Sequence, residues 1–266
     1  MAGALSIIKV ASLNCQGLNE YYKRMALFDY LKCSDLAVIF LQETKLKPEN
    51  ERKYMNEWHN GKCIFNSVVG GKSGTAILIN HRGVEIAGPS YIDVEGRVIA
   101  IDIVYFGCKF HVVNSYGPNS QDLRLAFINR LYLYMDSNRP IIWAGDHNIA
   151  TDPLLDRYPQ RFDGDYGRKQ IMELQRTFDL KDSCRVLYPA NSMFTFRRGT
   201  SRSRIDKICV SSNFGINAFS HKHLLGFSDH EMIVVTLRFT SLYKKGPGVW
   251  RNNCSYYLED NFLDDL

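Results

Sequence analysis

Polar side chains that could do chemistry recur where apolar stretches of the chain begin or end. Glu43 closes the run Val-Ile-Phe-Leu-Gln-Glu, and Asp146 and Asn148 close Ile-Ile-Trp-Ala-Gly-Asp-His-Asn. The same kind of position is occupied by Asn14, Tyr116, Asp206, Asp229 and His230. Burying such groups beside apolar strands costs free energy unless they are used. If the strands share sheets, their ends meet at one rim, and this cluster of carboxylates, amides and one imidazole suits a hard cation such as Mg²⁺.

Each of these residues alone has an ordinary structural explanation. A glutamate that follows a strand, such as Glu43, commonly lies in a turn or caps a helix. Asp146 and Asn148 fit an Asx-type turn, and Ser228–His230 fits a turn that starts a strand. The interpretation as a reactive centre therefore depends on the conjunction of six such ends, in one order along the chain.

Hydrophobic periodicity predicts the elements that would position these groups. Strands are expected at 6–14, 36–43, 74–80, 98–106, 109–116, 141–145, 193–197, 204–211 and 230–239. Helices are expected at 20–33, 120–136 and 167–178, where apolar residues recur at three- or four-residue spacing. The run 36–43 is apolar almost throughout, which is typical of a strand buried on both faces.

The organisation of the chain favours one large domain followed by a linker. Hairpins and strand–helix crossovers alternate over residues 1–239, which indicates an α/β (α+β mixed) domain of mixed sheets packed in layers. Residues 240–266 contain the break Lys244–Gly248 and no segment that would pair with the domain. We interpret them as a linker toward a downstream domain. The alternative is a C-terminal arm that folds back on the domain.

The composition is that of an ordinary globular protein, with 45% hydrophobic and 23% charged residues. The net charge of +5 becomes +9 for residues 1–254, once four C-terminal acids are set aside: Glu259, Asp260, Asp264 and Asp265. Such a positive balance suits a polyanionic partner. Seven scattered cysteines without a C-x-x-C pair fit a reducing compartment. No signal peptide or bilayer-spanning run is recognised, so an intracellular protein without membrane contact is expected.

Four short motifs together resemble the motif series of the endonuclease/exonuclease/phosphatase superfamily. They are Leu41-Gln42-Glu43-Thr44-Lys45, Gly145-Asp146-His147-Asn148, Ser203-Arg204-Ile205-Asp206 and Ser228-Asp229-His230. Residues 6–239 most resemble the apurinic-like endonuclease domain of LINE-type (non-LTR) retrotransposons, on the strength of Leu154–Arg157 and Phe194–Gly199. Trp250–Asn253 is similar to the connector that precedes reverse transcriptase in these polyproteins. The resemblance implies a DNase I-like, four-layered α/β sandwich of two mixed sheets flanked by helices.

The resemblance also implies which residues bind metal and phosphate. Glu43 would be the main carboxylate on Mg²⁺, with Asn14 and Asp229 as further ligands and Mn²⁺ as a substitute ion. Phosphate oxygens would be bound by Tyr116, Asn119, Thr195 and Ser228. Whether one or two metal ions take part stays open.

Acid–base chemistry is implied for the remaining motif residues. Asp146, helped by Asn148, would orient or deprotonate the attacking water. His230, paired with Asp206, would stand as a cation beside the scissile phosphate. The formal base, Asp146 or His230, stays open. His147 departs from the family pattern, which usually has a bulky apolar residue there, and a packing role is favoured over a metal or proton role.

The expected substrate follows from basic side chains around a predicted hairpin tip at Gly199. Residues 195–207 contain one acid and five basic residues: Arg197, Arg198, Arg202, Arg204 and Lys207. An arginine-rich hairpin beside an active site can enter a minor groove and respond to its width. Alternatively, it is a solvated edge hairpin whose charges prevent aggregation. We favour nicking of one strand of double-stranded DNA, with the arginines as DNA-binding residues.

The resemblance further implies that the freed 3′-hydroxyl primes reverse transcription by a downstream domain of the same polypeptide. The isolated domain is expected to be monomeric, and to act in the nucleus after synthesis in the cytoplasm. Two alternatives stay open: an abasic-site DNA repair endonuclease, and a catalytically silent DNA-binding module with the same fold. A lipid phosphatase is disfavoured, because no hydrophobic loop accompanies the motifs.

Overall fold

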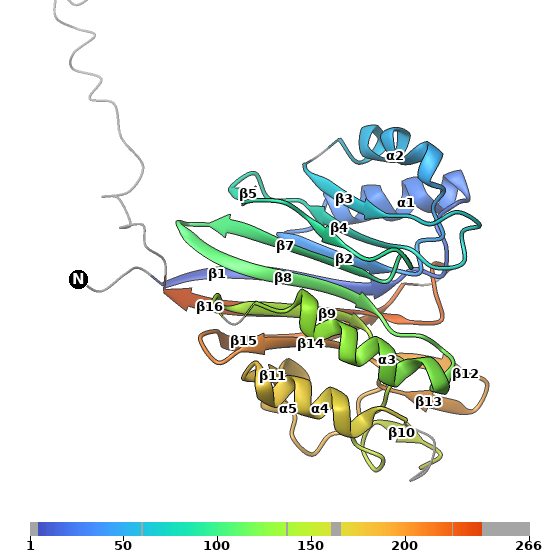
Figure 1. Cartoon of the computed structure of the whole chain (residues 1–266), viewed down its shortest axis with the longest axis vertical. Coiled ribbons are helices and arrows are strands. Elements are labelled where there is room, and N and C mark those ends of the chain that lie inside the picture. The colour runs from blue at the N-terminus through green and yellow to red at the C-terminus, as the bar shows by residue number, and fades with distance from the viewer. Residues whose placement is uncertain (1–4, 60, 137, 161–165, 225, 241–266) are drawn as a thin grey trace, which may run out of the picture.

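The strands predicted from the apolar runs assemble into two large mixed sheets in the computed structural model, which describes residues 5–59, 61–136, 138–160, 166–224 and 226–240 (Figure 1). The first sheet has the strand order β15-β16-β1-β2-β4-β3. Its strands are β1 (Leu5–Asn14), β2 (Val38–Gln42), β3 (Cys63–Asn66), β4 (Thr75–Ile79), β15 (Gly215–His223) and β16 (Glu231–Thr240). β1 and β2 run parallel, and the other neighbours run antiparallel.

The second sheet has the order β11-β14-β9-β8-β7-β5, and β6 also pairs with β7. Its strands are β5 (Val84–Ile86), β6 (Tyr91–Ile92), β7 (Val98–Tyr105), β8 (Cys108–Tyr116), β9 (Ile141–Asp146), β11 (Leu180–Asp182) and β14 (Asp206–Ser211). Here β8 and β9 run parallel. A small third sheet, in the order β10-β13-β12, lies at the lower right of Figure 1 and consists of β10 (Arg157–Tyr158), β13 (Ser201–Ser203) and β12 (Phe196–Arg198).

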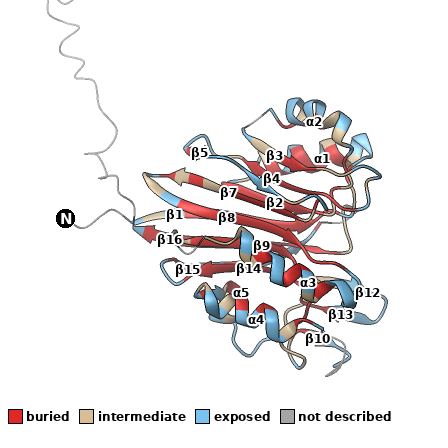
Figure 2. Ribbon diagram, in the orientation of Figure 1, coloured by how far each residue is buried: buried red, intermediate tan, exposed pale blue. Residues whose placement is uncertain are grey.

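Helices cover the outer faces of the two large sheets, which gives the predicted four layers. The helices are α1 (Tyr21–Lys32), α2 (Glu51–Trp58), α3 (Gln121–Leu131), α4 (Arg168–Thr177) and α5 (Ser183–Leu187), with 3₁₀ turns at Pro48–Asn50 and Tyr132–Tyr134. Alternation along β1 sends Val10 between the sheets and Leu13 toward α1 and α2. Trp143 of β9 packs on the other side, with α3 and α4. Figure 2 shows the buried strands between helices whose outer faces are exposed.

The boundaries expected from the sequence are shifted in a few places, each for a local reason. The helix over 20–33 is confirmed, with the Glu20 carboxylate accepting from the backbone N–H groups of Tyr22 and Lys23 as its N-cap. The hairpin between β7 and β8 turns at Phe106–Gly107, both with positive φ, so β8 begins at Cys108. The helix expected over 120–136 ends at Leu131 and continues as a 3₁₀ turn.

The hairpin expected around Gly199 is divided between two sheets. β12 and β13 form the hairpin itself, whereas the following strand, β14, starts only at Asp206 and belongs to the second large sheet. α2 and β15 were not predicted, because α2 is short and β15 is an edge strand with mostly exposed side chains. The linker was expected over 240–266. Thr240 is the last residue of β16, and residues 241–266 lie outside the described residues. In the described ranges we find no helix with the length and apolar character needed to cross a membrane.

Candidate active site

Strand pairing places the motif residues along one edge of the two large sheets. In the second sheet, Tyr116, Asp146 and Asp206 are direct neighbours, because Asp146 pairs with Tyr116 on β8 and with Asp206 on β14. In the first sheet, Asn14 ends β1 and Glu43 follows β2, its parallel neighbour. His230 immediately precedes β16, the antiparallel neighbour of β1. The topology therefore creates two rows of polar groups, one on each sheet.

Asn14 and Asp146 join the two rows. The Asn14 amide donates from Nδ2 to Asp146 Oδ2 at 3.0 Å. Asp146 Oδ1 accepts from the backbone N–H of Asn148 at 2.9 Å, so the Asx turn considered above is present and orients the carboxylate. Gly145, with φ of +152°, must be glycine here, because a Cβ would lie 1.9 Å from the Ser115 carbonyl oxygen.

A buried histidine–aspartate pair lies next to Asp146. His230 Nδ1 lies 3.0 and 2.9 Å from the two Asp206 carboxylate oxygens. The other ring nitrogen, Nε2, lies 3.9 Å from Asp146 Oδ2 and 4.0 Å from Asp229 Oδ1, too far for hydrogen bonds. Asp206 thus fixes the imidazole through Nδ1 and leaves Nε2 directed toward the carboxylates of Asp146 and Asp229.

Thr195 has a different role from the one predicted. We expected it to bind a phosphate oxygen, but it is only 1% exposed, and its hydroxyl donates to Asp206 Oδ2 at 2.6 Å. The same hydroxyl oxygen accepts from the backbone N–H groups of Ile205 and Asp206, at 3.3 and 3.2 Å. The phosphate assignment is therefore wrong, and Thr195 holds Asp206 in place.

Burial and neighbouring charge shift the proton affinities of the site. Burial raises the pKa of Asp146 to about 6, aided by the nearby Asp206 charge and opposed by His230. Burial alone would lower the pKa of His230, but the charge and hydrogen bond of Asp206, with Asp146 and Asp229, outweigh it and raise the pKa to about 10. The pKa of Tyr116 is raised, mainly by burial, while Asn119 hydrogen-bonds its hydroxyl. His230 is therefore a cation at neutral pH.

The three predicted metal ligands offer oxygen donors that fit a hard divalent cation. Asp229 Oδ1 is buried and has no hydrogen-bond partner among the residues that the structure describes, which is costly unless a cation or donor binds there. Asn14 Oδ1 accepts one hydrogen bond, from Gln16 N at 3.0 Å, and keeps a second lone pair. Glu43 has a left-handed backbone, φ +53°, and its carboxylate pairs with Lys45 Nζ at 2.8 Å. Such strain is typical of functional positions.

Residues 11–230 match the model of the Endonuclease/Exonuclease/phosphatase family. The chain belongs to this family. It is 27% identical over 268 aligned positions to the "Transposon TX1 uncharacterized 149 kDa protein" of Xenopus laevis, an alignment that covers 97% of this chain and 20% of that protein. It therefore spans about a fifth of this relative's length. An exodeoxyribonuclease of Bacillus subtilis is 28% identical over 237 positions, 77% of this chain and 89% of that enzyme.

Solved structures support the family's fold. An AP endonuclease from Leishmania major superposes with a TM-score of 0.71 at 20% identity, covering 87% of this chain and 88% of the other. An AP endonuclease from Archaeoglobus fulgidus gives 0.69 at 21% identity, covering 86% and 98%. At this identity the likeness concerns the fold, and it confirms the predicted DNase I-like architecture.

Two groups of side chains in the described residues have potential metal-ligand geometry. The first group consists of Asp146, Asp206 and His230, whose potential ligand atoms lie within 4.8 Å of one another. However, both Asp206 oxygens face His230, and one also accepts from Thr195. The trio is therefore better described as a hydrogen-bonded acid–imidazole system than as a cation cage.

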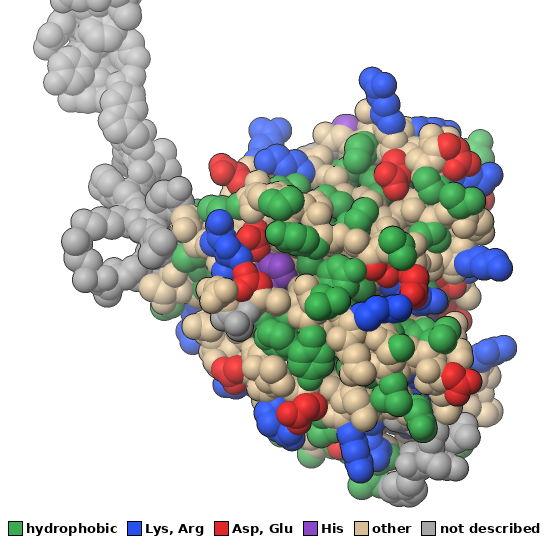
Figure 3. All heavy atoms as spheres, viewed as in Figure 1, with side chains coloured by type: hydrophobic (Ala, Val, Ile, Leu, Met, Phe, Trp, Pro, Cys, Tyr) green, Lys and Arg blue, Asp and Glu red, His purple; other side chains and the backbone are tan. Residues whose placement is uncertain are grey.

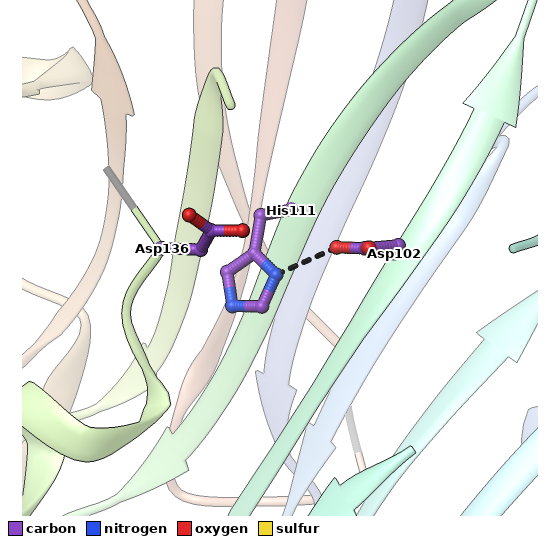
Figure 4. Close-up of side chains that lie close together, drawn as sticks. All are labelled: Asp102, His111 and Asp136. Carbon is purple, nitrogen blue, oxygen red and sulfur yellow. Dashed lines mark hydrogen bonds and ion pairs between the residues drawn. The ribbon is translucent and has the colours of Figure 1, made fainter. Parts of the chain in front are cut away.

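The second group, Asp102, His111 and Asp136, lies beside a cavity of about 540 Å³ that the motif residues do not line (Figure 4). His111 Nδ1 lies 2.9 Å from Asp102 Oδ1, and its Nε2 lies 2.8 Å from the Tyr134 carbonyl oxygen. Both ring nitrogens of His111 therefore already have a protein partner. Arg139 pairs with both aspartates. The side chains of this group are therefore partnered with one another and with Arg139, and we describe it as an ion-pair cluster.

The predicted DNA-contacting arginines fall into two classes. Arg197, Arg198 and Arg202 are exposed on β12 and β13, and Arg197 also pairs with Glu231 Oε1 at 3.1 Å. Arg204 is 1% exposed and bonds to Asp156 and Asp182, so its predicted DNA contact is wrong. Lys207, counted with the basic hairpin, is also buried. On the face shown in Figure 3, basic and acidic side chains are interspersed, without one dominant sign.

His147 packs as favoured from the sequence. Its ring stacks on Trp143, with centroids 4.3 Å apart and planes inclined by 23°. Burial lowers its pKa well below the ordinary value, so the ring is neutral.

Arg97 was missed by the sequence reasoning. Its guanidinium lies 5.0 Å from the centre of the Tyr116 ring, and its Nη1 donates to the Tyr116 carbonyl oxygen at 3.2 Å. A single basic residue at the start of a strand carries no pattern that would have singled it out.

Proposed function

We propose that this chain is a divalent-metal-dependent endonuclease that hydrolyses a phosphodiester bond of duplex DNA, nicking one strand and leaving a 3′-hydroxyl. The single observation that carries the proposal is the His230 imidazolium, supported by Asp206 and directed by Nε2 toward Asp146 and Asp229. A phosphodiester is an anion whose transition state gains further negative charge, so a fixed cation beside oxygen ligands suits it.

Each residue of the site has a separate proposed role in hydrolysis. Asp146, held by Asn14 and by the Asn148 backbone, orients the attacking water and accepts its hydrogen bond. His230 stabilises the charge that develops on the phosphate oxygens. Glu43, Asn14 and Asp229 would hold Mg²⁺ or Mn²⁺, which supplies a Lewis acid when bound. Tyr116, Asn119 and Ser228 are proposed to bind phosphate oxygens.

Duplex DNA is favoured as substrate because the arginine-bearing hairpin of β12 and β13 is bonded directly to the segment that carries Asp229 and His230. Phe196 at the start of β12 bridges to His230, and the Arg197 backbone N–H donates to the Asp229 carbonyl at 3.3 Å. Arg198 and Arg202 are exposed farther along the hairpin. Such a projection beside the scissile phosphate can read groove width and deformability.

The test is to compare a supercoiled plasmid with a short duplex that contains one abasic site. With Mg²⁺ we expect conversion of the plasmid to the nicked circle, loss of nicking in EDTA, and nick ends that a DNA polymerase extends. Similarity to a DNA-(apurinic or apyrimidinic site) endonuclease of Dictyostelium discoideum, 28% identical over 157 positions, favours repair as the second candidate. Strong preference for the abasic duplex would establish that candidate and overturn ours.

The hairpin makes a separate prediction. In a catalytically inactive variant of the protein, replacing Arg198 or Arg202 by glutamine should weaken binding to duplex DNA several-fold. Each replacement should also lower the salt dependence of the DNA-binding constant, measured as the slope of log K against log salt concentration, by about one. Arg176→Gln is the matched control, because Arg176 is exposed on α4, outside the proposed DNA face. Binding titrations at several salt concentrations measure the effect. Equal losses in all three variants would show that the hairpin has no special contact.

We further propose that the nicked 3′-hydroxyl primes reverse transcription by a downstream domain of the same polypeptide, in the nucleus. The similarity to the transposon protein over nearly the whole chain supports this, since that relative is about five times longer. A longer polypeptide carrying this domain should extend its own nicks when given RNA template and nucleotides, and Glu43→Gln should abolish that extension.

A further inference from the structure

A cluster of charged side chains is buried beneath the hairpin and takes no part in the chemistry proposed above. Asp156 is fully buried and accepts from Arg204 twice, from Nε at 2.8 Å and from Nη2 at 3.0 Å, and also from Arg185. Arg204 Nη1 donates in turn to Asp182 Oδ2 at 2.7 Å. Lys207, also buried, donates to the carbonyl oxygens of Ile149 and Arg204, at 2.9 and 3.0 Å.

Asp156 also closes the loop that follows the catalytic turn. Its Oδ2 accepts from the Thr151 backbone N–H at 3.2 Å, from the Thr151 hydroxyl at 3.0 Å, and from the Asp152 N–H at 3.0 Å. The Asp156 carbonyl oxygen accepts from the backbone N–H of Arg204 at 2.8 Å. One carboxylate is therefore bonded both to the 151–156 loop and to the residue that links the hairpin to β14.

The surface above this cluster consists of two segments distant in sequence. Arg157 and Tyr158 form β10, directly after Asp156, and pair with Ser203 and Arg202 of the hairpin. Leu154 and Tyr158 are about half exposed. The loop and the hairpin thus present one continuous face, and the buried cluster sets the position of each segment relative to the other.

The energetics indicate that this cluster provides geometry rather than stability. Buried ion pairs are often no more stabilising than apolar packing of the same volume, because desolvation offsets their attraction. Removing one partner, however, leaves an uncompensated charge that must move or find water. Burial alone would raise the pKa of Asp156, but Lys207 and Arg204 outweigh it and lower the pKa well below its usual range. Asp156 is thus ionised, with several donors that fix its orientation.

We propose that Asp156 is a specificity-determining positioning residue, which holds the 151–158 loop and the 196–203 hairpin in one arrangement. This arrangement would select the base-pair steps of the DNA at which a strand is nicked. This inference rests on the proposed nicking of duplex DNA. A rigid two-segment surface fits only those steps whose groove width and deformability match it. A loosened surface accommodates more steps, while the metal ligands and the His230–Asp206 pair keep their own contacts.

The test maps nick positions on a mixed-sequence duplex library under single-hit conditions, for the wild type and Asp156→Asn. We expect the preference for favoured over average sites to fall about tenfold, which equals roughly 1.4 kcal/mol of discrimination. The nicking rate summed over all sites should stay within about threefold of the wild type. An unchanged site distribution would overturn the proposal. Arg185→Gln, at the edge of the cluster, is a milder second variant, and it should shift the distribution in the same direction.

A matched control separates positioning from general loss of stability. Arg139→Gln breaks the remote cluster of Asp102 and Asp136 shown in Figure 4 and should leave the nick distribution unchanged. If it broadens the distribution equally, destabilisation is the cause and the proposal is wrong. Amide hydrogen exchange tests the inference without nicking. Residues 151–158 and 196–203 should exchange faster together in Asp156→Asn, and unchanged exchange in either segment would contradict the proposal even if the wild type proved not to nick DNA.

Discussion

Glu43→Gln is expected to lower plasmid nicking about a thousandfold, because it removes the main anionic ligand of the proposed metal. A Lewis acid stabilises transition-state charge by several kcal/mol, and roughly 4 kcal/mol corresponds to that loss in rate. The neutral glutamine has almost the same shape, so the fold and the left-handed turn at this position should persist. Nicked-circle formation against Mg²⁺ concentration measures the rate, and a duplex-binding titration shows whether DNA is still bound.

Glu49→Gln is the control for Glu43→Gln, since Glu49 is an exposed acid in the nearby Pro48–Asn50 turn. It removes the same charge from the same region and should leave the rate within about twofold. If Glu43→Gln nicks normally at all Mg²⁺ concentrations, Glu43 is not the metal carboxylate. If it loses DNA binding in parallel with nicking, the effect is on substrate binding rather than on the metal.

Asp206→Asn is the second variant for which we expect a large loss of nicking, and the loss should depend on pH. The Asp206 carboxylate is the main reason why the pKa of buried His230 is raised to about 10, since burial alone acts in the opposite direction. Without it, the imidazole loses its proton at much lower pH. The nicking rate should fall roughly 100- to 10,000-fold near neutral pH, the range typical for removal of acid–base support.

The direction of this pH dependence follows from which protonation form of each group is active. Imidazolium is the active form of His230, so in the wild type its contribution persists until pH rises toward 10. In Asp206→Asn it should vanish as pH rises through the neutral range. Asp146, with a pKa of about 6, limits the wild type in acid, and loss of the Asp206 charge shifts this limb in the variant. The rates are therefore compared above pH 7, where Asp146 is ionised in both proteins, and we expect the ratio of variant to wild-type rate to decrease from pH 7 to pH 9.

Asp102→Asn provides the matched control for Asp206→Asn. Asp102 accepts from His111 in an equivalent aspartate–histidine pair far from the motif residues. Its loss should leave the pH profile of nicking unchanged. A rate ratio for Asp206→Asn that is constant with pH would show that Asp206 supports the site structurally, without setting the protonation of His230.

Much of the fold was predictable because burial leaves a local signature. β2 is apolar up to Gln42 and β9 up to Gly145, since each strand is buried on both faces. α1 and α4 were recognisable from their periodicity. Elements with little burial were missed. β15 lies at a sheet edge with mostly exposed side chains, and such a strand imposes almost no pattern on its residues.

The sequence by itself determined which groups are available for chemistry, and the resemblance of ordered motifs pointed to their family. Only the tertiary structure decided what each group touches. Arg202 and Arg204 are two positions apart in one basic stretch, yet β13 leaves Arg202 exposed, and the chain turns Arg204 inward onto Asp156. Thr195 likewise bonds to Asp206 rather than facing solvent. Charge and spacing are properties of a chain segment, whereas burial and partners depend on which distant segments pack against it.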